Sequence, residues 1–514
     1  MALNDQYLND DLGSLFIQVD GVGPQDLSWL GCHDLGDVSK PLGDVERQYC
    51  PDPAARGRWI VSSRLQGPEG EVTFDMELAI GRLADALELA VAKKCAIPVY
   101  DVFYACGGRT TFSPFWRVLV IPDALATSMS VNSPSSRHAD GSIPTQITET
   151  FSFSAQDLFW AYELGYARKT IVEVENLLDI ANCSSPSCAG VCGGAVESCD
   201  VMVASATAGA AAPPEIYRTT DGGQTWVAMA FQPFLATEDA SSIVCFELDD
   251  GTVRVLTSIG VTTVATPAFV AYTDDIGATA WVQSQVGTVD TEFFPWNGCL
   301  FALNGRNVWA CTDTGGGLAG NVYKSSDFGV TWTLMLGGTG DALNCVRFVN
   351  DRVGMVVGDQ NEIWLTVNGG ADWVTVTGPA AQAAVDCKTC VIFSSMRFYV
   401  GYSDGEIWMT ADGGTTWTMC PSPIIAGYTL TACNDMGAIN ENVIWAAYCF
   451  NVAADEYGVM ARTITGGEQW ETWVANTACT AGVGINAVAA CDVNHAFGVG
   501  CVETTAWVME VAAA

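Results

Sequence analysis

Positively charged side chains and histidines are scarce in this sequence. Its 514 residues include 22 Lys and Arg and 3 His against 58 Asp and Glu, and only 16% of the chain is charged. Residues 1–180 hold 25 acids and 13 bases, and residues 181–514 hold 33 and 9. Neither part has the basic surface that grips nucleic acid, so we expect no sequence-specific nucleic-acid binding. Two readings of the acidity stay open: a surface that repels passing DNA, and one that only keeps the protein soluble.

Long apolar runs are also missing. No stretch approaches 18 consecutive apolar residues, so we expect no membrane-spanning segment. The first residues, Met1-Ala-Leu-Asn-Asp-Gln, are polar and acidic, and we recognise no secretory signal peptide. Because Gly is abundant, at 52 residues, the composition favours many short strands joined by tight turns.

Cysteine, by contrast, is plentiful, at 20 residues. Four of them cluster in a stretch rich in Ser, Gly and Ala: Cys183, Cys188, Cys192 and Cys199. Their spacing does not match the paired ligands of a zinc knuckle or ribbon, and no histidine is near. A metal site, one or two local disulfides and free buried thiols all remain open. We predict no metal and no cofactor.

One eight-residue pattern occurs six times between residues 219 and 470. Thr219-Thr-Asp-Gly-Gly-Gln-Thr-Trp226 is the first copy, and copies ending at Trp332 and Trp417 match it fully. Three copies are degraded: one has an extra residue, one has Asn for Asp, and one has Thr for Asp. The predicted key positions are Asp221, Trp226, Asp275, Trp281, Asp327, Trp332, Asn368, Trp373, Asp412, Trp417 and Trp470. A period in the forties to fifties indicates one supersecondary unit reused along the chain.

The residue types suit a turn between two strands. An Asp carboxylate accepts hydrogen bonds from nearby N–H groups, Gly permits positive φ, and Trp buries a large ring between repeats. The pattern resembles the Asp-box, or bacterial-neuraminidase repeat, of sialidases, sortilin-type receptors and photosystem II assembly factors. The resemblance implies a β-propeller in which each box is a structural turn between the two outer strands of a blade, away from the family's catalytic centre.

Cysteine recurs at a matching period, at Cys199, Cys245, Cys299, Cys345, Cys390, Cys433 and Cys491. We expect each to lie at the end of a blade's innermost strand, where small residues are needed. Seven cysteines against six boxes predict seven blades, with six as the alternative. We also predict that Cys245, Cys345, Cys390 and Cys433 are buried and unpaired.

The last blade is too short for four strands, because only 23 residues remain from Cys491. An open edge there would leave backbone groups unpaired. We predict that Lys169-Thr-Ile-Val-Glu-Val174, which alternates and has strong β propensity, pairs with 506–511 as the missing outer strand.

The first 180 residues contain no repeat and read as α+β. We expect strands at 15–20, 59–65, 72–78, 99–104, 116–121, 125–131 and 145–153, with 59–65 and 72–78 forming a hairpin. Helices are expected at 82–95 and 154–162. The predicted organisation is a sandwich-like or barrel-like assembly domain at 1–180, a connector at 181–198 and the propeller at 199–514.

This order of elements, with the long acidic loop from Gly21 to Pro53, resembles phage tail-tube and tail-terminator proteins. That family forms stacked hexameric rings. The resemblance implies a virion subunit made in the host cytoplasm, a homo-oligomer in contact with other virion proteins, with its propeller decorating the outside of the tube.

The residues do not support sialidase activity. That family clamps a carboxylate with three arginines, whose planar guanidinium groups bind it bidentately. Here Arg218 and Arg462 stand beside boxes, Arg347 and Arg352 flank a tight turn, and Pro213–Arg218 replaces the family's Arg-Ile-Pro segment.

We expect no functional role for the other candidate sites. His138 and His495 are expected on the surface, the glycine-rich stretch Asp313–Gly320 lacks the Lys of a phosphate loop, and Asp249-Asp250 and Asp274-Asp275 are turn acids. We therefore expect a non-enzymatic structural or assembly protein. The rival hypotheses are a glycan-binding or glycoside-hydrolase propeller and a factor that docks a partner.

Overall fold

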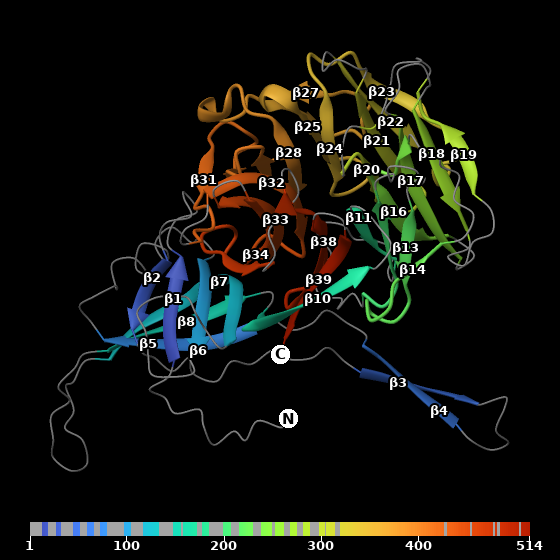
Figure 1. The fold of residues 1–514 in the computed structure, drawn as a ribbon. Helices are drawn as coiled ribbons and strands as arrows, with labels where there is room; N and C mark the ends of the chain where they lie inside the picture. The colour runs from blue at the N-terminus through green and yellow to red at the C-terminus, as the bar shows by residue number, and fades with distance from the viewer. Residues whose placement is uncertain are drawn as a thin grey trace, which may run out of the picture. The chain divides into compact units, whose positions relative to one another are not determined.

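The structure is a computed structural model of the full chain, and Figure 1 shows its ribbon. It describes residues 13–18, 27–31, 45–51, 59–65, 72–79, 97–103, 117–132, 148–155, 158–171, 177–183, 199–206, 215–229, 238–248, 252–261, 268–274, 281–287, 294, 298–303, 305–313, 319–425, 429–452, 455–475, 479–480, 484–502 and 505–513. The chain divides into two compact units, the second of which contains residues 164–514. This division differs from the expected boundary at 180, because strands upstream of it belong to the second unit.

The first unit is built from antiparallel strands. Its main sheet has the order β2-β1-β6-β7-β8-β5, with β9 also paired to β7, and β3 pairs with β4 in a separate ladder. The bounds are β1 Gly13–Gln18, β2 Leu27–Gly31, β3 Val45–Pro51, β4 Trp59–Leu65, β5 Val72–Ala79, β6 Ile97–Phe103, β7 Arg117–Asn132, β8 Thr148–Ala155 and β9 Phe159–Tyr162.

Three expectations for this unit are wrong. β4 pairs with β3 and β5 with β8, so the predicted hairpin does not form. The two strands expected at 116–121 and 125–131 are one strand, β7, which carries a bulge between Ala126 and Ser128. The expected helix at 154–162 is a strand, because Phe159–Tyr162 pairs with Val120–Arg117 and tertiary pairing overrides local propensity. The helix expected at 82–95 lies outside the described residues.

Within the described part of residues 164–513, seven antiparallel sheets follow one another, and we call them blades 1 to 7. Blade 1 is β11 Leu177–Asn182, β12 Met202–Ala206, β13 Ile216–Thr219 and β14 Val227–Ala228. Blade 2 is β15 Glu238–Asp239, β16 Ile243–Glu247, β17 Val253–Val261, β18 Phe269–Thr273 and β19 Val282–Gln285. Blade 3 is β20 Leu300–Ala302, β21 Val308–Asp313, β22 Gly320–Ser325 and β23 Thr333–Gly337.

The remaining blades repeat the same plan of consecutive strands. Blade 4 is β24 Leu343–Phe348, β25 Gly354–Gly358, β26 Glu362–Thr366 and β27 Val374–Thr375, with 3-10 turns η3 at Asp359–Asn361 and η4 at Ala380–Gln382. Blade 5 is β28 Cys387–Ile392, β29 Phe398–Tyr402, β30 Ile407–Thr410 and β31 Thr418–Cys420. Blade 6 is β32 Thr429–Ala438, β33 Ile444–Val452, β34 Asp455–Thr463, β35 Glu471–Val474 and β36 Cys479–Thr480.

Blade 7 closes the series with a strand from far upstream, as predicted. It consists of β37 Ile485–Asp492, β38 His495–Val502, β39 Thr505–Ala513 and, on its outside, β10 Leu164–Ile171. The register runs from Leu164 opposite Ala513 to Ile171 opposite Ala506, and Figure 1 shows the two strands side by side. The strand begins earlier than expected, and residues 172–174 lie outside the described part. Trp473 Nε1 of blade 6 donates to the Leu164 carbonyl at 3.0 Å.

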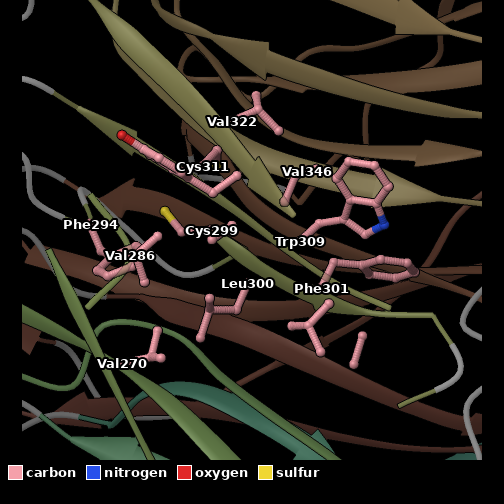
Figure 2. Packing of buried hydrophobic residues seen from close by; sticks show 14 of the residues in the cluster. Val270, Val286, Phe294, Cys299, Leu300, Phe301, Trp309, Cys311, Val322 and Val346 are labelled. Atoms are coloured by element: carbon pink, nitrogen blue, oxygen red, sulfur yellow. The ribbon is translucent and has the colours of Figure 1, made fainter. Parts of the chain in front are cut away.

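Apolar side chains fill the spaces between neighbouring blades. The second strands are buried on both faces, as in Gly354-Met-Val-Val-Gly358, whereas the short outer strand Val374–Thr375 is exposed. Figure 2 shows the cluster around Trp309, whose ring stacks on Phe348 at a centroid distance of 3.8 Å. Burial of this apolar surface is the main force that holds each blade against the next. In the part of the chain that is described, no helix has the length and apolar character needed to cross a bilayer.

Candidate functional site: box turns and axial cavity

All six boxes connect the third and fourth strands of a blade, in blades 1 to 6. In the first box, Thr219 Oγ1 donates to Asp221 Oδ1 at 2.8 Å and accepts the N–H of Gly223 at 3.0 Å. The Asp221 carboxylate then receives the Thr225 N–H at 2.9 Å and the Thr225 hydroxyl at 2.6 Å. Both ends of the turn are therefore tied to one carboxylate.

The other two full copies reproduce this network closely. Asp327 accepts the Thr331 N–H at 2.8 Å and its hydroxyl at 2.6 Å, and Asp412 accepts the same groups of Thr416 at 2.8 and 2.7 Å. The repeated geometry shows that the carboxylate's lone pairs are used inside the turn.

The degraded copies keep the same bonds with other side chains. Asn368 Oδ1 accepts the Asp372 N–H at 2.9 Å, while its Nδ2 donates to the Asp372 carboxylate at 2.8 Å. In the last box the Gln469 N–H donates to Thr465 Oγ1 at 3.0 Å. Asp275 lies outside the described residues, although Trp281 lies half-buried at the start of the next strand.

These bonds make the box carboxylates more acidic than usual. The Thr225 hydroxyl and N–H lower the pKa of Asp221 to about 2. The Thr416 N–H and hydroxyl likewise lower the pKa of Asp412. Burial raises the pKa of Asp327, but its hydrogen bonds from Thr331 outweigh this, so the pKa is lowered. Such carboxylates stay ionised and are poorly suited to accept or deliver a proton near neutral pH.

Three of the box tryptophans pack edge-on against aromatic residues of their own or the preceding blade. Trp373 meets Trp309 at 6.5 Å between centroids and an interplanar angle of 85°, Trp417 meets Phe398 at 77°, and Trp470 meets Tyr448 at 90°. The box glycines also fix this packing. Gly329 has φ +85°, and a Cβ there would lie 2.1 Å from Leu256 of the preceding blade.

A cavity of about 230 Å³ lies where the innermost strands of all seven blades meet. Its charged lining residues are Asp179 of β11, Arg347 of β24 and Asp435 of β32. The rest of the lining is mostly apolar, with Phe301 and Phe348 as its aromatic members. This axial cavity is the candidate functional site.

Arg347 and Asp435 form an ion pair in the cavity wall, with 3.5 Å between Nη2 and Oδ1. Arg347 Nη1 also donates to the carbonyls of Gly298 at 3.1 Å and Val346 at 3.0 Å. Burial raises the pKa of Asp435, and the Arg347 charge only partly offsets this. Burial lowers the pKa of Arg347, but the neighbouring Cys345 and Asp435 raise it above its usual range.

Asp179 is the other carboxylate of the cavity. Its oxygens accept the Ile180 N–H at 2.8 Å, the Ile243 N–H at 2.9 Å and the Ser242 hydroxyl at 2.9 Å. Burial, followed by repulsion from Asp435, raises the pKa of Asp179 to about 7 despite these bonds. Near neutral pH this carboxyl is therefore divided between its charged and neutral forms.

Around the cavity, hydrogen bonds involving side chains link the inner strand of each blade to that of the next. From blade 1 to blade 4, Asp179 accepts from Ser242 and Ile243, Ser242 Oγ accepts the Leu300 N–H at 3.2 Å, and Cys299 donates to the Asn344 carbonyl at 3.5 Å. From blade 4 to blade 7, Asn344 Nδ2 donates to the Cys387 carbonyl at 2.9 Å, Thr389 donates to Asp435 at 3.3 Å, and Asp435 accepts the Val488 N–H at 3.0 Å. Finally, Asn486 Nδ2 of blade 7 donates to the Leu177 carbonyl of blade 1 at 2.6 Å. The last bond joins blade 7 to blade 1 and completes the ring.

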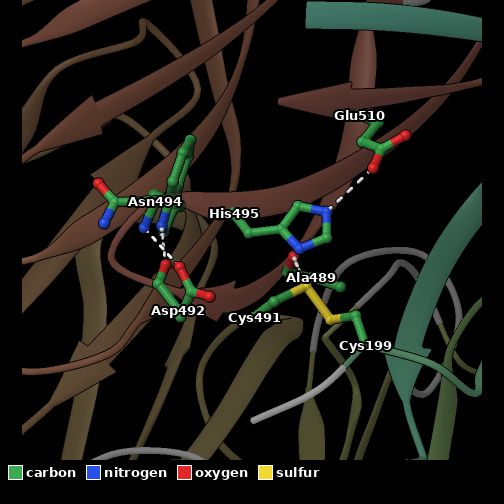
Figure 3. The surroundings of a disulfide bond; sticks show 8 residues. Cys199, Ala489, Cys491, Asp492, Asn494, His495 and Glu510 are labelled. Atoms are coloured by element: carbon green, nitrogen blue, oxygen red, sulfur yellow. Dashed lines mark hydrogen bonds and ion pairs between the residues drawn. A yellow bond between two sulfur atoms is a disulfide. The ribbon is translucent and has the colours of Figure 1, made fainter. Parts of the chain in front are cut away.

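Two disulfides hold blade 1 to both of its neighbours. Cys183 pairs with Cys245 of blade 2, and Cys199 pairs with Cys491 of blade 7. Figure 3 shows the second bond beside His495, whose Nε2 lies 3.2 Å from Glu510 Oε1. The prediction that Cys245 is unpaired is thus wrong, because β11, missed from sequence, carries Cys183 to its side.

The other three predictions of unpaired cysteines are confirmed. Cys345, Cys390 and Cys433 are buried and form no disulfide, as predicted. The expectation that each recurring cysteine ends an innermost strand is wrong for most of them: Cys199 precedes β12 and Cys299 precedes β20. Within their inner strands lie Cys245, Cys345, Cys390, Cys433 and Cys491, whereas Cys183 directly follows β11. The two disulfides are long-range, whereas local ones were considered, and Cys188 and Cys192 lie outside the described residues. Among the described residues, no group of three or more His, Cys, Asp and Glu is placed to hold a metal ion.

The candidate arginines are dispersed. Arg254 pairs with Asp274, Arg462 is buried beside Glu471, and Arg306 lies over the Phe328 ring. Of the described residues that line the cavity, Arg347 is the one arginine. His138 and Asp249-Asp250 lie outside the described residues.

Asp179 and Asp435 were missed from sequence, and Arg347 was assigned only to the flank of a turn, because these three residues lie on different inner strands and no local pattern brings them together. Besides the boxes and the cysteines, the sequence contains a third recurring motif: Glu-Ile-Tyr at 215–217 and Glu-Ile-Trp at 362–364 and 406–408. The Glu accepts a hydrogen bond from the aromatic residue two positions later, from Trp364 and Trp408 at 2.9 Å each and also from Tyr217. This motif marks the start of the third strand in blades 1, 4 and 5 and would have placed that strand from the sequence.

No family model and no curated protein matches the chain. Solved structures do resemble it. "YCF48 bound to D1 peptide" has a TM-score of 0.45 at 14% identity, over 68% of this chain and 97% of that one. YCF48 from Cyanidioschyzon merolae has a TM-score of 0.43 at 13% identity, over 67% and 98%. The glycoside hydrolase family 74 (GH74) xyloglucanase from Xanthomonas campestris has a TM-score of 0.45 at 16% identity, over 65% of this chain and 52% of that one.

At such identities a likeness concerns the fold and says nothing of activity or partner. The sheets themselves carry the fold: the described part of the chain is mainly β, and the successive antiparallel sheets of its second unit, joined from blade 7 back to blade 1, form a β-propeller.

Proposed function

We propose that this chain is a non-enzymatic docking protein whose axial cavity receives a positively charged side chain from a partner protein. The observation that carries the proposal is the charge balance of the cavity. Two carboxylates, Asp179 and Asp435, face one guanidinium, Arg347, and the ion pair at 3.5 Å is with Asp435. A cation that enters beside Asp179 would relieve both the burial penalty and the repulsion that raise its pKa.

The same groups are poorly placed for catalysis. Asp179 and Asp435 each accept hydrogen bonds from the inner strand of the following blade, and Arg347 is bound to two carbonyls as well as to Asp435. A general acid or base must be able to exchange its proton with a substrate atom. Because their lone pairs hold the ring together, these carboxylates supply a fixed electrostatic field.

The charge of the whole chain favours the same kind of partner. The formal net charge is −36. Such an excess of acids attracts basic surfaces over long range and raises the rate of encounter with them. The cavity would then select, among basic partners, those that present one Lys or Arg on a narrow segment.

The phage tail-tube hypothesis concerned the first 180 residues, and the hairpin in its order of strand, hairpin, helix and strands does not form. The helix of that order, at 82–95, lies outside the described residues. No specific observation favours it or a glycan ligand over docking. Both remain alternatives, and the following experiment has an outcome that would favour the glycan ligand.

The test is calorimetric titration of the full chain with the peptide Gly-Ser-Lys-Ser-Gly and its norleucine analogue. We expect the lysine peptide to bind at least about tenfold more tightly, a difference of about 1.4 kcal/mol. Asp179→Asn should remove most of this preference. Asp200→Asn, at an exposed carboxylate, is the matched control and should keep it.

A second readout does not depend on variants. Because a cation favours the ionised form of Asp179, binding to the wild-type protein at pH 6 should release protons and at pH 8 should not. Equal binding of both peptides, or a loss of affinity in Asp200→Asn equal to that in Asp179→Asn, would mean that only the diffuse acidic surface attracts the probe. Binding of a xyloglucan oligosaccharide in the same cavity would favour the glycan alternative.

A further inference from the structure

Two thiols on neighbouring inner strands lie unusually close together. Cys345 of β24 and Cys390 of β28 have their sulfur atoms 3.7 Å apart, and both side chains are fully buried. Cys390 lines the axial cavity, so a small solute in that cavity reaches the edge of the pair. The box turns do not involve either residue, and neither forms a disulfide.

A disulfide elsewhere in the ring already links two neighbouring blades at their inner strands. Cys183 and Cys245 join the inner strands of blades 1 and 2 with 4.9 Å between their Cα atoms. Cys345 and Cys390 lie on the inner strands of blades 4 and 5. Neighbouring inner strands therefore come close enough for a covalent link at two places. Between blades 1 and 2 the disulfide is formed, and between blades 4 and 5 the two thiols lie side by side.

The surroundings of Cys345 favour a reactive thiolate. Burial raises its pKa, but the hydrogen bond from Cys390 and the positive charge of Arg347 outweigh burial and bring the pKa to about 7. Burial holds the pKa of Cys390 and of Cys433 well above the usual range and raises the pKa of Cys420 to about 12. Thiolate character, which decides reactivity toward oxidants, is therefore greater at Cys345 than at Cys390, Cys420 or Cys433.

We propose that Cys345 and Cys390 are a peroxide-reactive dithiol that closes into a third crosslink between neighbouring blades. The Cys345 thiolate attacks one oxygen of hydrogen peroxide, forming an S–O bond as the O–O bond breaks, and the departing hydroxide takes up a proton to give water. The Cys390 sulfur then attacks the sulfenic sulfur, forming the S–S bond and releasing a second water with the Cys390 proton. Two thiols are oxidised and one peroxide is reduced to two waters.

The test uses the native full-length protein with hydrogen peroxide as the probe. After brief exposure the thiols are alkylated under denaturing conditions, and peptides are mapped by mass spectrometry. We expect a peptide pair linked through Cys345 and Cys390, two hydrogens lighter than the sum, which a phosphine reductant reverses. The link should form at least about tenfold faster than Cys420 or Cys433 loses its thiol, so the same sample supplies its own control.

Two variants assign the steps. In Cys390→Ser, whose hydroxyl can still donate a hydrogen bond to Cys345 but cannot form the S–S bond, Cys345 should accumulate a sulfenic acid that dimedone traps. In Cys345→Ala the Cys390 thiol should stay alkylatable. The proposal is wrong if peroxide oxidises Cys345 to sulfinic acid in the wild-type protein without any link. It is also wrong if all buried thiols lose reactivity at one common rate, which would indicate unfolding. Both readouts on the wild-type chain stand even if a variant folds poorly.

Discussion

The pKa of a single carboxylate in this protein depends on what surrounds it. Asp221 is exposed and receives hydrogen bonds from its own turn, so its pKa falls to about 2. Asp179 receives as many hydrogen bonds, yet its pKa rises to about 7 because burial and Asp435 disfavour its charge. The number of donors alone therefore does not predict the protonation state, and solvent access decides between the two cases.

The raised pKa of Asp179 makes stability depend on pH. The unfolded chain has an ordinary carboxyl with a pKa near 3.8, so between about pH 4 and 7 the folded state binds the proton more tightly. The contribution of Asp179 is thus most favourable at low pH and declines as pH rises through 7, by up to about 1.4 kcal/mol per pH unit. Urea unfolding from pH 4.5 to 8 should show this decline in the wild type and lose it in Asp179→Asn. Asp200→Asn should follow the wild type, and parallel profiles for all three proteins would contradict the assignment.

Elements that repeat were predictable, and elements defined by long-range partners were mostly not. The box turns follow from local chemistry, since Thr, Asp and Gly bond within eight residues, and the degraded copies show that Asn368 or Thr465 can replace Asp. The strand that closes blade 7 was found because an unpaired edge demands a partner. By contrast, the inner strand β11 and the axial Asp179 could not be placed, because their partners lie in blades 2 and 7 and nothing local marks them.

The closing strand β10 can be tested by removing it and supplying it again. A chain that starts at Leu177 keeps all of blade 1 but lacks β10, whereas one that starts at Leu164 keeps both. Eight residues of β10 pair with β39, so we expect the shorter chain to lose about 2–4 kcal/mol of unfolding free energy. A synthetic peptide of residues 162–173 should restore much of it, and its reversed sequence should not. Equal stability of the two chains would show that the edge needs no partner.

At the scale of the whole molecule, charge and self-association oppose each other. The acids outnumber the bases by 36, so copies of the chain repel one another at low ionic strength. Homo-oligomer formation stays a prediction of the sequence, and it must act against this repulsion.

Light scattering of the full chain at increasing salt can decide the question. If copies assemble through a specific interface, screening should strengthen the association, and the apparent mass should rise above 54.5 kDa between about 50 and 500 mM salt. Negative-stain images at high salt would then show rings or tubes. A monomer at every ionic strength would leave docking of a different protein as the favoured role and would contradict assembly through residues 1–180.

The Cys199–Cys491 bond has a consequence for how the protein responds to mechanical load. Leu164 lies opposite Ala513, so the two chain ends of the propeller leave the β10–β39 ladder at the same end, and a pull on them opens its hydrogen bonds one at a time. That peeling meets little resistance. Once β10 and β39 are extended, however, the covalent path between the ends runs through the disulfide, whose cysteines are 292 positions apart in sequence. Residues 200–490 then lie inside a closed loop that carries no tension. Reduction of this bond exposes residues 246–490 to the load, whereas the Cys183–Cys245 disulfide still bypasses residues 184–244.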